Sequence, residues 1–101
     1  MAKKELIDPS GFTRGSLDYW AAHKGELGNI QKARCGGQGG KILEIEGTEG
    51  VMRLTGCTCG YGGEGPQGTA EVLKDIGVSH QDAVELMQLE AFQVLVQCCR
   101  D

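Results

Sequence analysis

Residues 43–54 read Leu-Glu-Ile-Glu-Gly-Thr-Glu-Gly-Val-Met-Arg-Leu, and this stretch decides the fold class. Apolar residues alternate with polar ones on both sides of the turn-like segment Gly47–Gly50. Such alternation around a glycine-flanked turn is typical of a β-hairpin with one apolar face. Arg53 is expected to lie across from a glutamate of the first strand. We therefore predict a β-hairpin over about residues 41–59 in a small antiparallel sheet.

A short helix is predicted on the N-terminal side of this hairpin. Asp8-Pro9-Ser10-Gly11 has the composition of a turn, and Ser16 can then act as the N-cap of a helix that ends near Gly25. Residues 26–34 give a mixed signal, and the glycines of residues 36–40 predict a connection.

Two helices are predicted on the C-terminal side. Pro66 suits the start of a helix over about residues 66–76, which stops at Gly77. Ser79-His80-Gln81-Asp82 is a capping box that begins a last helix over about residues 80–97. The whole pattern predicts an α+β fold in a single small domain over residues 1–101.

The last predicted helix is apolar around much of its circumference. A small hairpin cannot cover so wide an apolar surface, and burial against a second copy of the chain would cover the rest. We therefore expect a homodimer formed through residues 80–97.

Composition and charge restrict the partners of the chain. The 101 residues are 40% hydrophobic and 24% charged, as in ordinary globular domains, with a formal net charge of −4. Residues 66–101 hold two basic and six acidic side chains. This acidic excess disfavours nucleic acid, whose binding depends on lysine and arginine at the phosphates.

The N-terminal residues carry no apolar run of signal-peptide length, and no stretch approaches the ~20 apolar residues of a membrane span. We expect a cytoplasmic protein that does not enter the membrane. The five cysteines are odd in number and two are adjacent, which favours reduced thiols over a disulfide framework.

The strongest candidate site is the glycine-rich loop that joins the hairpin to the next helix. Glycines let the backbone approach a ligand closely, and the first amides of a helix lack partners within the helix. The loop is therefore predicted to bind a small anion, such as a nucleotide, with Tyr61 stacking and Gln67 and Thr69 donating. The predicted ligand-binding residues are Gly60, Tyr61, Gly62, Gly63, Gly65, Gln67, Gly68 and Thr69.

Other features of this loop limit the hypothesis. The loop contains Gly60-x-Gly62-x-x-Gly65, but no further strand follows to complete the βαβ unit of a dinucleotide-binding fold. Glu64 would repel an anion, and the glycines could simply make a tight strand-to-helix turn. No Ser/His/Asp set or carboxylate pair indicates catalysis, and the sequence identifies no cofactor.

Cysteine chemistry gives two alternative hypotheses. Cys59 precedes a helix N-terminus, which can stabilise a thiolate, but no basic residue follows it before Lys74. Cys57 and Cys59 with Cys35 and a histidine, His23 or His80, could supply four zinc ligands. Their spacing departs from that of structural zinc sites, so we predict neither catalytic nor metal-ligating residues.

Residues 73–83 have the rhythm of a helix-turn-helix, but its second helix would present acidic groups to DNA. Two functions therefore remain: binding of a small anion at residues 60–69, and a non-catalytic structural or protein-interaction module. The second would act as a homodimer through its apolar C-terminal helix.

Overall fold

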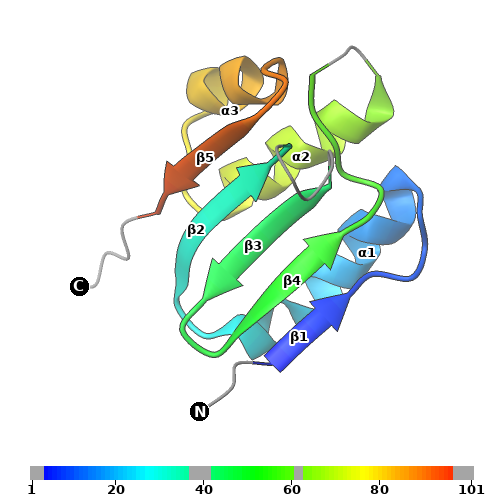
Figure 1. The fold of residues 1–101 in the computed structure, drawn as a ribbon, viewed down its shortest axis with the longest axis vertical. Helices are drawn as coiled ribbons and strands as arrows, with labels where there is room; N and C mark the ends of the chain where they lie inside the picture. The colour runs from blue at the N-terminus through cyan, green and yellow to red at the C-terminus, as the bar shows by residue number, and fades with distance from the viewer. Residues whose placement is uncertain (1–3, 37–41, 61–62, 97–101) are drawn as a thin grey trace.

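The computed structural model describes residues 4–36, 42–60 and 63–96, and its elements follow one another along the chain as drawn in Figure 1. In chain order the elements are β1 (Lys4–Ile7), α1 (Thr13–His23), the 3-10 helix η1 (Lys24–Leu27), β2 (Ile30–Cys35), β3 (Leu43–Gly47), β4 (Gly50–Leu54), α2 (Glu64–Asp75), α3 (His80–Met87) and β5 (Phe92–Leu95). The fold is α+β, as the sequence predicts.

The five strands form one sheet in the order β1-β4-β3-β2-β5. The predicted hairpin is β3–β4, in which Leu43 pairs with Leu54 and Glu44 with Arg53. The Arg53 side chain lies across from Glu44, with 3.0 Å between Nε and a carboxylate oxygen. The prediction of a purely antiparallel sheet is wrong, because β1 pairs in parallel with β4.

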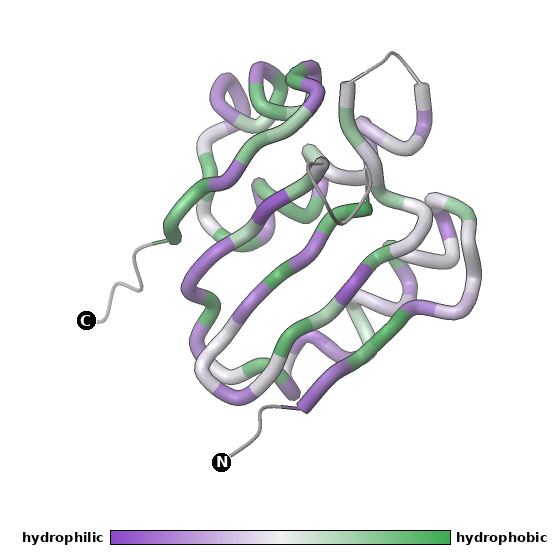
Figure 2. Tube along the Cα trace, viewed as in Figure 1, coloured by the Kyte–Doolittle hydropathy of each residue, from purple (hydrophilic) through white to green (hydrophobic). Residues whose placement is uncertain are grey.

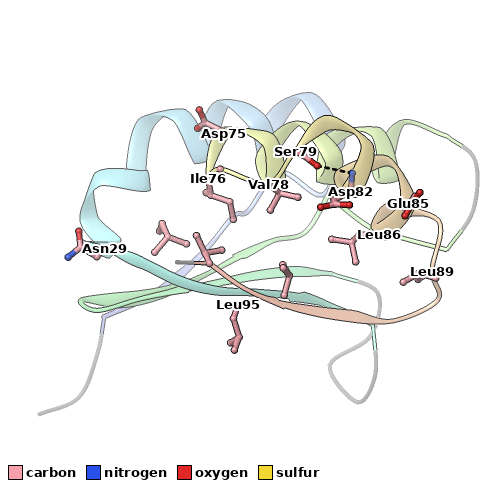
Figure 3. A pocket seen from close by; sticks show the side chains of 15 residues that line it. Asn29, Asp75, Ile76, Val78, Ser79, Asp82, Glu85, Leu86, Leu89 and Leu95 are labelled. Carbon is pink, nitrogen blue, oxygen red and sulfur yellow. Dashed lines mark hydrogen bonds between the residues drawn. The ribbon is translucent and has the colours of Figure 1, made fainter. Parts of the chain in front are cut away.

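All helices lie on one face of the sheet, which gives two layers (Figures 1 and 3). Alternate strand residues face the helices and are buried, and hydropathy alternates in the same way along β3 (Figure 2). The other face carries charged side chains in cross-strand ion pairs: Arg34 and Arg53 both contact Glu44, and Lys32 contacts Glu46 at 3.2 Å. The single core therefore lies between the sheet and the helices.

The N-terminal helix begins earlier than predicted. It starts at Thr13, so Ser16 is not its N-cap but a buried residue of its second turn. The Ser16 hydroxyl instead accepts a hydrogen bond from the Gly56 amide at 2.7 Å. This bond joins α1 to the segment that follows β4, which ends at Leu54 rather than continuing to Cys59.

The prediction of one helix over residues 80–97 is also wrong. The N-cap bond of the predicted capping box is present, since the Ser79 hydroxyl accepts a hydrogen bond from the Asp82 amide, but α3 ends at Met87. Residues 92–95 form β5, which pairs antiparallel with β2. An apolar run suits either a buried helix or a strand, and here the free edge of β2 decides. No helix in the described residues is long and apolar enough to cross a membrane.

Gly56 allows α1 to approach the end of β4 closely. A Cβ added there would lie 2.1 Å from the carbonyl carbon and 2.2 Å from the carbonyl oxygen of Phe12, both backbone atoms. We predict that Gly56→Ala lowers the free energy of unfolding by about 1–3 kcal/mol, because the backbone must shift. Gly25→Ala is the matched control, since no atom lies within 4 Å of its added Cβ, and it should change stability by under about 0.5 kcal/mol. Urea unfolding measures both, and equal effects would contradict the packing argument.

Candidate functional site

The glycine-rich loop runs from the end of the β4 segment into α2. Tyr61 and Gly62 lie outside the described residues. Gly65 is buried in the first turn of α2, which begins at Glu64, two residues before Pro66. Gly63 and Gln67 are exposed, as is the carboxylate-bearing Glu64. Within the described residues, the exposed part of the predicted anion site therefore includes a negative charge.

Several of the predicted donors already bind the chain itself. The Gly60 amide donates to the Met87 carbonyl at 2.9 Å, and the Gln67 amide to the Gly63 carbonyl at 3.3 Å. The Thr69 hydroxyl donates to the Thr58 carbonyl at 2.6 Å. These bonds stabilise the loop and leave fewer groups to hold an anion, so anion binding stays a prediction.

Gly68 also has a structural role at this loop. A Cβ added to it would lie 2.6 Å from Cγ2 of Thr13 and 3.2 Å from the Cys57 sulfur. The residue is buried where α2 approaches α1 and the segment after β4. Gly68 therefore permits close packing of α2 against α1 and Cys57.

The three described cysteines, Cys35, Cys57 and Cys59, are all buried. Burial, together with a hydrogen bond to the Cys59 thiol, raises the pKa of Cys35 far above its usual range. Burial and the Asp8 charge raise the pKa of Cys57 to about 12. A nucleophilic cysteine requires the opposite shift, so these pKa values disfavour thiolate chemistry at Cys35 and Cys57.

The histidines considered as zinc ligands are bound elsewhere. His23 contacts Glu26, with 2.6 Å between Nδ1 and a carboxylate oxygen, and His80 lies 3.4 Å from the Lys74 amine. Within residues 4–36, 42–60 and 63–96, no group of three cysteine, histidine or acidic side chains has a geometry that could hold a metal ion.

A buried polar cluster surrounds Asp8, of which 1% is exposed. The carboxylate accepts hydrogen bonds from the Ser10 amide at 2.8 Å, from the Ser16 hydroxyl and from the Thr55 hydroxyl at 3.2 Å. Burial raises the pKa of Asp8, but these hydrogen bonds outweigh it and hold the pKa below its ordinary value. Because it is enclosed and well supplied with donors, this carboxylate joins β1, α1 and β4 rather than reacting with a substrate.

A large hollow lies between the helical layer and the sheet, at the side of β5 (Figure 3). Its volume is about 1120 Å³. We call it the β5 groove and define it by its lining residues: Gly28, Asn29, Ile30, Asp75, Ile76, Gly77, Val78, Ser79, Asp82, Glu85, Leu86, Leu89, Val94, Leu95 and Val96.

Aliphatic side chains that remain partly exposed form the interior of the β5 groove. Figure 3 shows Ile76, Val78 and Leu86 extending from the helical layer toward the sheet. Ile30, Val94 and Val96 are likewise only half-buried, and Leu89 is 48% exposed. Aliphatic side chains left incompletely covered in a concave surface are typical of a binding site.

The charged groups of the β5 groove are all acidic. Asp75 is already paired, because its carboxylate contacts the Lys24 amine and the Trp20 ring nitrogen, each at 2.8 Å. Asp82 and Glu85, three residues apart on α3, are exposed and take part in no ion pair among the described residues. Among the described residues no lysine, arginine or histidine lines the groove, so no described lining residue neutralises the charges of Asp82 and Glu85.

Only part of this site can be predicted from the sequence. Leu86, Leu89, Val94 and Val96 belong to the run whose wide apolar surface predicts an interface. Ile30 and Ile76 join that surface only because β2 and the end of α2 lie beside β5. Comparison with protein families, with curated proteins and with solved structures finds no match to this chain, so the site rests on its geometry alone.

The Asp8 cluster predicts a pH dependence of stability. The pKa of Asp8 in the folded state lies below its pKa in the unfolded chain. The carboxylate therefore contributes its full stabilisation to the fold above the unfolded-state pKa, and this contribution is lost as the pH falls through the folded-state pKa. Asp8→Asn should lower the free energy of unfolding by about 1–3 kcal/mol above about pH 5, and this deficit should shrink below about pH 4. Urea unfolding over a pH series measures it, with the exposed Asp18→Asn as control. A deficit that grows in acid would contradict the assignment.

Proposed function

We propose that this protein is a non-catalytic interaction module whose β5 groove binds an apolar, positively charged segment of a partner protein. The observation that carries the proposal is the combination of half-buried aliphatic side chains with unneutralised acidic residues in one hollow. The proposal retains the protein-interaction function that the sequence analysis left open. It places the binding surface in the β5 groove instead of on a helix over residues 80–97.

The size and chemistry of the groove favour a peptide segment over a small molecule. Its volume of about 1120 Å³ lies near the upper end of the ~300–1,000 Å³ that is typical of small-ligand sites, and is large enough for several side chains of a peptide. Most of its lining is aliphatic, so binding would remove apolar surface from water, which is the main driving force of association.

The charge of the groove favours a cationic segment. Asp82 and Glu85 lie on α3 above the groove (Figure 3), where lysine or arginine of a partner can reach them. The net charge of −4 would also attract a basic partner over longer distances. The same charges repel phosphate, which argues against DNA binding through the first turn of α3.

Two expectations from the sequence remain proposals of lesser support. A homodimer could bury the groove, but it would bring identical acidic residues of two copies together. A cytoplasmic location agrees with the thiols of Cys57 and Cys59, which form no disulfide, since reducing compartments preserve thiols.

The proposal is tested with two labelled synthetic peptides of identical valine, threonine and lysine composition. In one peptide the valines alternate with polar residues as in a strand, and in the other they follow helical spacing. At least one should bind, as measured by fluorescence anisotropy, whereas analogues with glutamate in place of lysine should not. If neither lysine peptide binds, or the glutamate analogues bind equally, the proposed function is wrong.

A charge-neutral variant locates the binding. Asp82→Asn with Glu85→Gln should weaken binding of the lysine peptide by about tenfold, because two exposed ion pairs are lost, and should reduce its salt dependence. Asp18→Asn with Glu49→Gln removes the same charge from exposed positions outside the groove and is the matched control. Equal weakening by both double variants would show a general charge effect instead of a site.

A further inference from the structure

Strand β5 leaves one edge of the sheet open. It is the last strand in the sheet order and pairs only with β2 among the described residues. Lys32 pairs with Leu95 and Ala33 with Val94, and the Val96 amide donates to the Gln31 carbonyl at 2.8 Å. Hydrogen-bonded pairs alternate along antiparallel strands, so the backbone groups of Val94 and Val96 face β2. Those of Gln93 and Leu95 face outward.

This open edge lacks the features that usually protect edge strands. Proteins place charges, proline or bulges at sheet edges to prevent pairing with another chain. The β5 sequence Phe-Gln-Val-Leu contains none of these, and the Leu95 side chain is 73% exposed. The opposite edge strand, β1, begins with the charged residues Lys4 and Glu5. The two edges therefore differ, and only β5 combines its edge with an apolar hollow.

The β5 groove lies along this same strand. Val94 and Val96 of β5 line the groove. Figure 3 shows α3 above the strand and the Leu95 side chain extending to the other face of the sheet. Side chains alternate between the two faces of a strand, so every second side chain of an added strand would enter the groove. Asp82 and Glu85 lie above those positions on α3.

We propose that the partner segment binds as an added β-strand on the open edge of β5. This inference rests on the proposed function and adds its geometry. The segment is extended, with aliphatic side chains at the groove-facing positions and a lysine or arginine that reaches Asp82 and Glu85. Main-chain hydrogen bonds to Gln93 and Leu95 contribute affinity, and the groove contributes specificity.

A partner of this chemistry fits the edge better than a second copy of the chain does. If two β5 strands paired antiparallel about a two-fold axis, the α3 helices of both copies would lie on the same face of the joined sheet. Their four carboxylates, two from each copy, would then approach one another without a basic residue of the groove to balance them. The acidic groove therefore favours a basic partner.

The experiment compares the two isomeric lysine peptides and one variant of the protein. The strand-patterned peptide should bind about tenfold more tightly than the helix-patterned one. Two further peptides carry methyl groups on alternate backbone nitrogens, one on the odd positions and one on the even positions. One of them should lose binding and the other should keep it, because only one set of backbone nitrogens faces β5. Leu95→Pro removes an outward amide that does not bond to β2, and should weaken binding about tenfold.

Leu95→Ala is the control for this variant, because it keeps the backbone amide and removes the side chain. Its affinity for the strand-patterned peptide should stay within about threefold of that of the unsubstituted protein. Thermal unfolding checks that Leu95→Pro remains folded. If the helix-patterned peptide binds more tightly, or if both methylation patterns are tolerated, the strand geometry is wrong while the proposed function stands. If light scattering finds a dimer that Leu95→Pro disperses, the edge is occupied by a second copy and the inference is overturned.

Discussion

A hydrogen bond between the glycine-rich loop and the end of α3 determines where the chain turns back toward the sheet. The Gly60 amide donates to the Met87 carbonyl, one of the carbonyls that a helix end leaves without a partner. Beside it the Cys59 thiol lies 3.5 Å from the Glu90 carbonyl. A Cβ added to Gly36 would lie only 2.3 Å from that same carbonyl oxygen. These contacts fix the turn between α3 and β5.

The length of α3 follows from this turn, and the β5 groove follows from the length of α3. The helix has only eight residues, so part of the sheet formed by β2 and β5 remains uncovered on the helical face. Val94 and Ile30 are therefore half-buried, whereas the central strand residues Ile45 and Met52 are completely buried. The glycine-rich loop contributes to function in this account by positioning the groove, in addition to any ligand it binds itself.

The sequence predicts the local elements of this fold better than their assembly. The β3–β4 hairpin, α2 and the start of α3 carry their own signals in alternation, turn residues and capping, and all three are present. The four residues of β1 become a strand only by pairing with β4, and residues 92–95 pair with β2 although their apolar run suits a helix equally well. Such long-range pairing overrides local propensity.

The candidate site was harder to predict for the same reason. A glycine near a helix start indicates either ligand approach or close packing, and at Gly68 the neighbouring Thr13 and Cys57 show that packing applies. The β5 groove combines β2, β5, α3 and the end of α2, which are distant in sequence. The apolar run within residues 80–97 and the acidic excess of residues 66–101 signalled part of its character in advance.

Amide hydrogen exchange along β5 tests the central claim, that an open strand edge beside an acidic apolar groove is the binding surface. In the free protein, the amides of Val94 and Val96 should exchange slowly and those of Gln93 and Leu95 rapidly. Adding the strand-patterned lysine peptide should slow the exchange of Gln93 and Leu95 selectively. Slow exchange of all four amides in the free protein, or no change at Gln93 and Leu95 when the peptide binds, would contradict the account.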